Sequence, residues 1–167
     1  MRTIKGLITI SALTLSMSVA AFSQTVLTSL DGSRVDLDAQ RGKVVVLAVG
    51  ASWLPLSAKQ IEYSNMLAKK YQGKDVVFYF IATDSSRAGK NFASDDAIRK
   101  FAAANKLSGT VLRDSDGSVT LRKYNVDQVP SFVVLDKTGR QVGEPFGGID
   151  SKYDITIPIS RAIDKLL

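Results

Sequence analysis

Runs of apolar residues, separated by polar turns, predict that strands and helices alternate along this chain. Residues 25–37 alternate loosely around the turn Asp31-Gly32, which is a signal for a β-hairpin. Residues 43–51 and 75–83 are apolar at nearly every position and rich in valine. Both runs are therefore expected to be strands that are buried on both faces of a sheet.

Helical spacing appears in the segments that follow these runs. Apolar residues recur every three or four positions between 55 and 71 and again between 159 and 166. Pro55 suits a first helical turn, because its missing N–H would have no partner there. Ser94 is expected to cap another helix, since two aspartates follow it and stabilise the positive end of the helix dipole.

The remaining segments complete the predicted topology. Residues 110–114 are expected to form a short strand and 119–126 a short helical segment. Residues 131–146 predict two strands across the turn Lys137-Thr138-Gly139. Early strands joined by helices favour parallel pairing, and the late pair favours an antiparallel hairpin. The fold class is thus predicted to be α/β, with a central mixed β-sheet and helices on both faces.

The first 23 residues have the pattern of a secretory signal peptide. Arg2 and Lys5 precede a short uncharged run, and the small residues Ala21 and Ser23 precede a cleavage point before Gln24. The sequence therefore predicts a signal peptide at 1–23 and one domain at 24–167, exported to the periplasm or the cell exterior. No membrane span is expected after cleavage. An uncleaved membrane anchor is the alternative.

Composition narrows the chemistry further. The formal net charge is +6, but acidic residues lie between the basic ones, so no basic stripe for nucleic acid is expected. The chain has no cysteine and no histidine. Disulfides are excluded, and the usual general base and the commonest metal ligand are missing. We therefore expect no metal and no cofactor.

Two segments carry a family resemblance. The first is WLPLS at 53–57, between a predicted strand and a predicted helix, and the second is YNVDQVPSFVVLDKTGRQV at 124–142. Together they resemble the thioredoxin-like superfamily, specifically its extracytoplasmic TlpA/ResA-like (redoxin) branch. The resemblance extends from about residue 30 to 167. It implies a thioredoxin-like fold with an N-terminal hairpin and an inserted β-α unit.

The resemblance also assigns positions in the site. Trp53 matches the family tryptophan, while Leu54 and Ser57 stand where the W-C-x-x-C motif has its two cysteines. Pro55 and Leu56 fill the middle positions, and Pro130 matches a proline whose peptide bond is cis in this family.

Thiol–disulfide exchange needs a thiolate and a second sulfur, so this site is expected to be degenerate and without redox activity. The family often has a buried carboxylate beneath the site, and residues 43–51 contain no acid.

Several functions stay open at this stage. Trp53, Leu54, Val129 and Pro130 are expected to form a surface that binds a protein or an extended peptide of the cell envelope, as a binding or chaperone-like module. The alternatives are a thiol-disulfide oxidoreductase, as the family implies, and a structural subunit of an envelope complex. A further alternative is that Leu54 packs under a loop and closes the groove.

Three other features have weaker functional interpretations. Ser57 could be a hydrolytic nucleophile, but no histidine is available to activate it. The stretch DSDGS at 114–118 resembles the start of a calcium loop, yet its twelfth position is Asn125 instead of a bidentate acid, so a plain turn is favoured. The polar loop 84–92 could contact a partner or simply be mobile.

Overall fold

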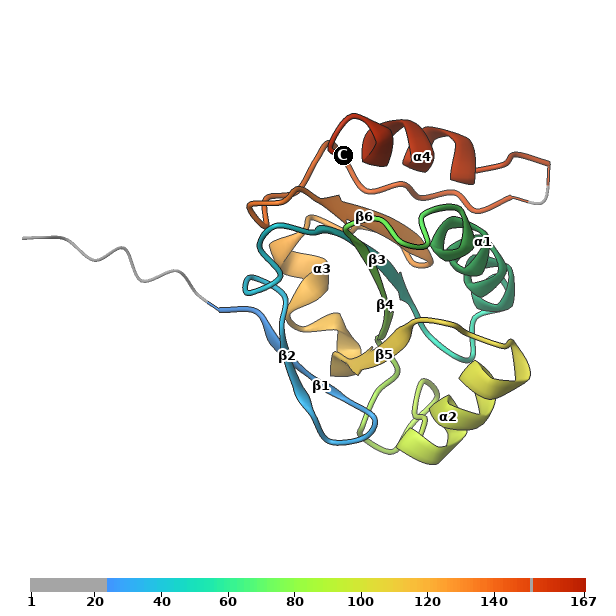
Figure 1. The fold of residues 1–167 in the computed structure, drawn as a ribbon. Coiled ribbons are helices and arrows are strands. Elements are labelled where there is room, and N and C mark those ends of the chain that lie inside the picture. Colours follow the sequence, from blue (N-terminus) through green and yellow to red (C-terminus); the bar gives the residue numbers. More distant parts are fainter. Residues whose placement is uncertain (1–23, 151) are drawn as a thin grey trace, which may run out of the picture.

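A mixed β-sheet forms the middle of the protein. The computed structural model describes residues 24–150 and 152–167, so the predicted signal peptide lies outside the described residues. The strands are β1 (Val26–Ser29), β2 (Arg34–Asp36), β3 (Val44–Gly50), β4 (Val76–Ala82), β5 (Thr110–Arg113) and β6 (Ser131–Leu135). They form one six-stranded sheet in the order β2-β1-β5-β4-β3-β6 (Figure 1).

Helices cover both faces of this sheet, as predicted. They are α1 (Ser57–Lys70), α2 (Asp95–Ala104), α3 (Thr120–Lys123) and α4 (Thr156–Asp164), with a short 3-10 turn, η1 (Ser115–Gly117). Helices α1, α2 and α4 lie on one side of the sheet and α3 lies on the other (Figure 1). The buried apolar side chains of α1, α2 and α4 belong to one hydrophobic cluster, and Tyr124 and Val126, which follow α3, belong to the other. No helix in the described ranges is long and apolar enough to cross a membrane.

The strand directions bring several loops to one edge of the sheet. Strands β3, β4 and β5 are parallel, so their carboxyl ends meet there. Strand β6 is antiparallel to β3, and its first residue, Ser131, pairs with Val49 near the end of β3. We call this the carboxyl edge: the loops after β3, β4 and β5 and the loop before β6 all lie on it.

The valine-rich runs are central strands, which explains their composition. Every residue of β3 is buried. Successive side chains of β3 point to opposite faces, so Val46 and Ala48 pack in the cluster under α1 and α4, while Val45 and Leu47 pack in the cluster on the α3 side. A strand in this position needs apolar residues at every position.

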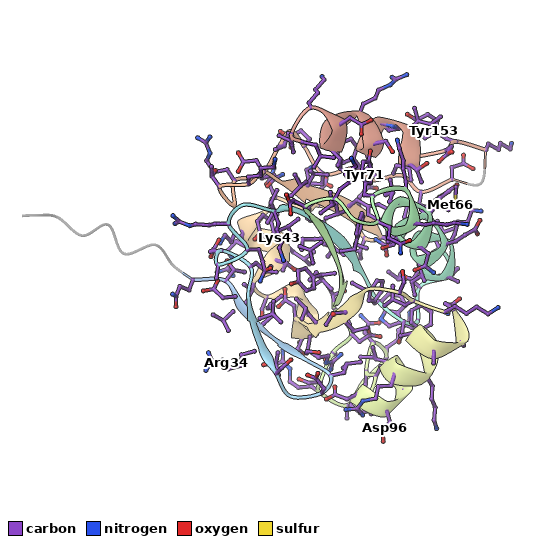
Figure 2. The ribbon with its side chains drawn as sticks, viewed as in Figure 1. Arg34, Lys43, Met66, Tyr71, Asp96 and Tyr153 are labelled. Atoms are coloured by element: carbon purple, nitrogen blue, oxygen red, sulfur yellow. The ribbon has the colours of Figure 1, made fainter. Side chains whose placement is uncertain are left out.

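Polar contacts attach the helices to the sheet and to one another. The Tyr71 hydroxyl donates to the Ser160 carbonyl (3.1 Å) and to Oδ1 of Asp164 (2.7 Å), which joins the end of α1 to α4 (Figure 2). The predicted cap of α2 is confirmed, because Ser94 Oγ accepts a hydrogen bond from the Ala97 N–H (3.2 Å). Helix α1 begins at Ser57, two residues later than the sequence predicted.

One predicted element is wrong. Residues after the 137–139 turn do not form a second regular strand and pair with β6 only through isolated bridges, at Gln141 and Phe146. Gly143 has a positive φ of 70°, and Pro145 has no N–H to donate. Both features interrupt a ladder of hydrogen bonds, so this segment covers the outer edge of β6 without joining the sheet along its length.

Candidate functional site

The turn between β3 and α1 presents apolar side chains at the carboxyl edge. Trp53 is 47% exposed and Leu56 is 43% exposed. Pro55 is also exposed, Leu54 is half-buried, and Ser57 is fully buried. The sequence predicted that Leu54 is the exposed apolar residue beside Trp53. In the structure, Leu56 is exposed more than Leu54.

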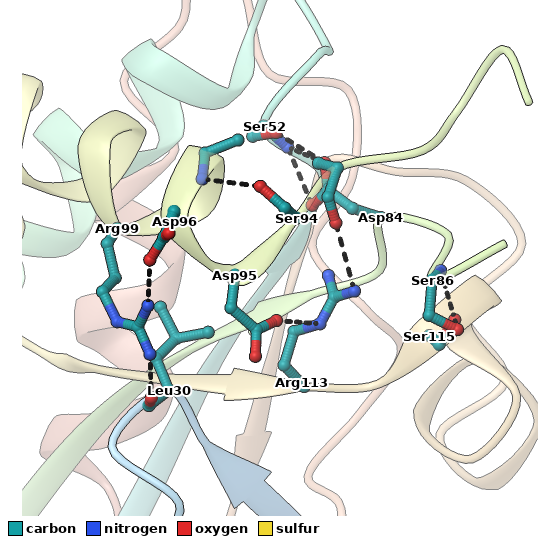
Figure 3. A network of polar contacts seen from close by, with 12 residues as sticks. Leu30, Ser52, Asp84, Ser86, Ser94, Asp95, Asp96, Arg99, Arg113 and Ser115 are labelled. Carbon is teal, nitrogen blue, oxygen red and sulfur yellow. Dashed lines mark hydrogen bonds and ion pairs between the residues drawn. The ribbon is translucent and has the colours of Figure 1, made fainter. Parts of the chain in front are cut away.

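A buried carboxylate holds the start of this turn. Asp84, directly after Thr83 at the end of β4, is completely buried. Its Oδ1 accepts hydrogen bonds from the Ser52 N–H (2.9 Å) and from the Ser52 hydroxyl (2.5 Å) (Figure 3). Both hydrogen bonds are buried with this side chain, so Asp84 holds the backbone immediately before Trp53.

A buried amide lies beneath the turn. Gln60 is fully buried in α1, and its Nε2 donates to the carbonyl oxygens of Val49 (3.1 Å) and Ser131 (2.7 Å). These two residues belong to β3 and β6, so a single side chain connects both strands to α1. A Cβ added to Gly50 would lie only 2.4 Å from Gln60 Oε1, so a larger residue here would displace the Gln60 amide.

The loop before β6 lies next to the turn. The Val129–Pro130 peptide bond is cis. Pro130 itself is buried, and Val129 is half-buried against the cluster on the α3 side. Because Ser131 pairs with Val49, this loop and the Trp53 turn extend from neighbouring strands at the same edge. The exposed residues of this loop next to Val129 are Asp127 and Gln128.

The geometry does not support Ser57 as a nucleophile. Its side chain is fully buried, and within the described residues its Oγ has no hydrogen-bond partner. Lys59, the nearest basic residue along the helix, is bound to Glu62 on the outer face (2.8 Å). That hydrogen bond raises the pKa of the Lys59 ammonium, so this lysine stays protonated and cannot accept a proton from a serine hydroxyl.

The calcium-like stretch also has a structural use. The Asp114 carboxylate is buried and accepts hydrogen bonds from the N–H groups of Val119 (3.1 Å) and Thr120 (2.7 Å) at the start of α3. In the described part of the chain, no group of three or more His, Cys, Asp or Glu side chains could hold a metal. Asp114 thus acts as a helix cap.

Two loops at the carboxyl edge are linked to each other. Arg87 donates to Oδ2 of Asp116 (3.2 Å), and this hydrogen bond holds the pKa of the Asp116 carboxyl below its usual value. The Ser86 N–H donates to Ser115 Oγ (2.9 Å) (Figure 3). The loop that begins at Asp84 is therefore bonded to η1.

Sequence reasoning missed Gln60 and Asp84. A signal existed for Gln60, because it lies three residues after Ser57 and next to Ile61 on the inward face of the helix. Asp84 follows a buried strand at the same edge as the turn, where parallel strands end. Residues 43–51 contain no acid; the buried groups that contact this turn and the strands beneath it are the Asp84 carboxyl group and the Gln60 amide.

Comparison with known proteins agrees with this fold. The chain is 28% identical over 119 residues to the thiol-disulfide oxidoreductase ResA of Bacillus thuringiensis subsp. konkukian. The alignment covers 71% of this chain and 64% of that relative, so the chain spans less than two thirds of the relative's length.

Solved structures are also similar. A secreted disulfide oxidoreductase of Mycobacterium tuberculosis is 27% identical with a TM-score of 0.63, over 86% of this chain and 96% of that one. The exposed lipoprotein thioredoxin of Streptococcus pneumoniae is 23% identical with a TM-score of 0.68, over 86% of this chain and 100% of that one.

The family model named Redoxin matches residues 15–147, which is most of the chain. The thioredoxin-like fold implied by WLPLS and by the segment around Pro130 is confirmed by these structural neighbours. The whole sequence of this chain contains no cysteine. The chain belongs to the Redoxin family, as a TlpA/ResA-like member of the thioredoxin superfamily in which Leu-Pro-Leu-Ser replaces the Cys-x-x-Cys motif.

Proposed function

We propose that this protein binds extended polypeptide segments at its carboxyl edge and does not catalyse thiol–disulfide exchange. The binding surface consists of the Trp53–Leu56 turn and the backbone beside Val129 and Pro130. Its role is that of a binding or chaperone-like module of the cell envelope, and no cofactor takes part in it.

The chemistry of exchange supports the negative half of this proposal. An exchange reaction requires a thiolate to attack and a second sulfur to resolve the mixed disulfide. Leu54 and Ser57 occupy the two positions, and the sequence has no cysteine elsewhere. Oxidoreductase activity, the function that family membership suggests, therefore lacks its reacting atoms.

The observation that carries the positive half is the exposure of Trp53 and Leu56 on a turn with a fixed backbone. Asp84 bonds to Ser52 on one side of the turn, and Gln60 bonds β3 to β6 beneath it. Exposed aromatic and aliphatic side chains on a rigid support bind with little loss of entropy. The neighbouring backbone before β6 offers hydrogen-bonding groups to an extended segment, as in strand-addition binding.

Two lines support an envelope location. Residues 1–23 have the secretory pattern, and similar proteins include one described as secreted and one described as an exposed lipoprotein. The segments available to this protein would then be those of other exported proteins.

The test is a cross-linking pull-down from the protein's own envelope extract. The parent is compared with a Trp53→Ala, Leu56→Ser variant and with a Leu167→Ser control. Leu167 is as exposed as Trp53, at 47%, but it lies beside Lys137 at the opposite edge of the sheet.

A partner that is recovered with the parent and the control, and lost with the Trp53 variant, supports the proposal. The same partners with all three proteins would contradict it and would favour a structural subunit that uses another face.

A further inference from the structure

A groove continues from the Trp53 turn along the outer side of α1. Its volume is about 620 Å³. It begins at Pro55, inside the turn, and ends at the loop between α2 and β5. The groove is lined chiefly by Pro55, Lys59, Glu62, Met66, Lys69 and Lys106. Met66 is 46% exposed and points outward from α1 (Figure 2). The Trp53–Leu56 turn is therefore continuous with this groove at Pro55.

The charge in this groove is concentrated at the end far from Trp53. Lys59 and Glu62 lie 2.8 Å apart and neutralise each other. Lys69 and Lys106 have no carboxylate within ion-pairing distance among the residues that the structure describes. Lys69 and Lys106 thus line the same groove as two cations that no described carboxylate neutralises.

The backbone that carries Lys106 is held in place from α1. Asn65 Nδ2 donates to the Lys106 carbonyl (2.9 Å), and Asn65 Oδ1 accepts from the N–H (3.0 Å) and the hydroxyl (2.8 Å) of Ser108. Lys106 also has a left-handed backbone conformation, with φ of 53°. Three hydrogen bonds therefore hold the backbone at Lys106 against α1, so the point from which this side chain extends is set before any ligand binds.

We infer that the groove binds an acidic stretch of the same extended polypeptide whose apolar residues contact Trp53 and Leu56. This inference rests on the proposed function and names the class of partner. Pro55 and Lys69 are separated by about 20 Å at 1.5 Å per helical residue. An extended chain rises about 3.3 Å per residue, so the acidic residues lie about six positions from the apolar ones. Charge complementarity selects the segment, and the Trp53 turn anchors it.

The test uses end-labelled synthetic peptides and fluorescence anisotropy. One peptide has Val-Leu and Asp-Glu separated by five Gly/Ser residues, and its matched control has Asn-Gln in place of Asp-Glu. Both are made in both chain directions. We expect the acidic peptide, in one direction, to bind about tenfold more tightly at low salt, and the difference to shrink at high salt.

Matched variants assign this difference to the groove. Lys69→Gln with Lys106→Gln is expected to abolish the preference for the acidic peptide. The control, Lys43→Gln with Lys74→Gln, changes exposed lysines outside the groove and is expected to retain it. Equal affinity of the parent for both peptides, or a preference that survives in the Lys69 and Lys106 variant, would overturn the inference.

The two proposals fail in different ways. If Trp53→Ala with Leu56→Ser weakens both peptides while the groove lysines have no effect, the acidic specificity is wrong and the proposed function stands. If the Trp53 variant binds both peptides as the parent does, the proposed function is wrong.

Other occupants are tested directly. The inference would also be overturned if the parent showed no preference for the acidic peptide but sedimented with phosphatidylglycerol vesicles, or associated with itself, in a way that depends on Lys69 and Lys106.

Discussion

Replacing Gln60 by glutamate tests the structure beneath the Trp53 turn, because the change is almost isosteric. The parent amide donates to two carbonyl oxygens, at 3.1 Å and 2.7 Å, from a fully buried position. An ionised carboxylate there would face the negative ends of both carbonyl dipoles without water. The protonated acid can still donate one hydrogen bond. The neutral form is therefore favoured in the folded protein, and the pKa of the introduced carboxyl group should rise.

The magnitude follows from this environment. Buried glutamates have their pKa raised by up to 3–5 units, and a rise of about 3 units corresponds to about 4 kcal/mol. Below about pH 4.3 the acid is neutral in both the folded and the unfolded state, so the variant loses little stability there. As the pH rises above that value, the unfolded state releases the proton first. Stability relative to the parent then falls by about 1.4 kcal/mol per pH unit until the folded pKa is reached.

The assay is thermal unfolding of parent and variant between pH 4 and pH 8. Near neutral pH we expect the variant to melt about 10 °C below the parent, and at pH 4 we expect a much smaller difference. Gln60→Met is the control, because it removes both hydrogen bonds without adding a titrating group. Its loss of about 1–3 kcal/mol should not depend on pH. A pH-independent difference for Gln60→Glu would refute the placement of Gln60 against the two carbonyls.

Four further changes test the site and its support. Gly50→Ala should lower the free energy of unfolding by about 1–3 kcal/mol, because its Cβ would lie 2.4 Å from Gln60 Oε1. In urea unfolding, the double variant with Gln60→Ala should lose less stability than the sum of the losses of the two single variants. Asp84→Asn should cost about 1–3 kcal/mol and lower the fluorescence anisotropy of Trp53, the only tryptophan, whereas the exposed control Asp127→Asn should do neither. Leu54→Cys should react with maleimide much faster than Ser57→Cys, since Ser57 is fully buried, and equal rates would contradict this geometry. Burial alone would raise the pKa of Asp38, but hydrogen bonds from Lys123 and Thr25 outweigh burial and lower this pKa. The stability that Asp38 contributes is therefore lost as the pH falls below about 4. Asp38→Asn should make acid unfolding less steep.

The sequence predicted best those elements whose local residue pattern is compatible with only one kind of structure. The run around Val46 is buried on both faces because β3 lies between β4 and β6. Ser94 followed by two aspartates caps α2, which is a local interaction that needs no knowledge of the fold. The family motif located the Trp53 turn, but it could not show that Leu56 is more exposed than Leu54, because that depends on where α1 begins.

The elements that were missed depend on contacts between distant segments. Gln60 connects two strands because Val49 and Ser131, 11 and 71 positions away, bring their carbonyls to it. Asp84 bonds to Ser52 across 32 positions. The incorrect strand after residue 139 has a different cause, since the alternation of the segment suggested pairing while Gly143 and Pro145 prevent it. For Gln60 and Asp84, no local sequence pattern identifies the distant residues with which they form hydrogen bonds.

The most direct test of the central claim is a titration of Trp53 fluorescence. Trp53 is the only tryptophan in the chain and lies on the proposed surface, so its emission reports directly on binding there. The ligand is a carboxymethylated, unfolded polypeptide that contains neither free thiol nor tryptophan. We predict a saturable blue shift, because a bound segment removes water from the indole, together with no turnover in a disulfide-reduction assay. An emission spectrum that does not change at saturating polypeptide, or disulfide reduction by this cysteine-free protein, would contradict the claim.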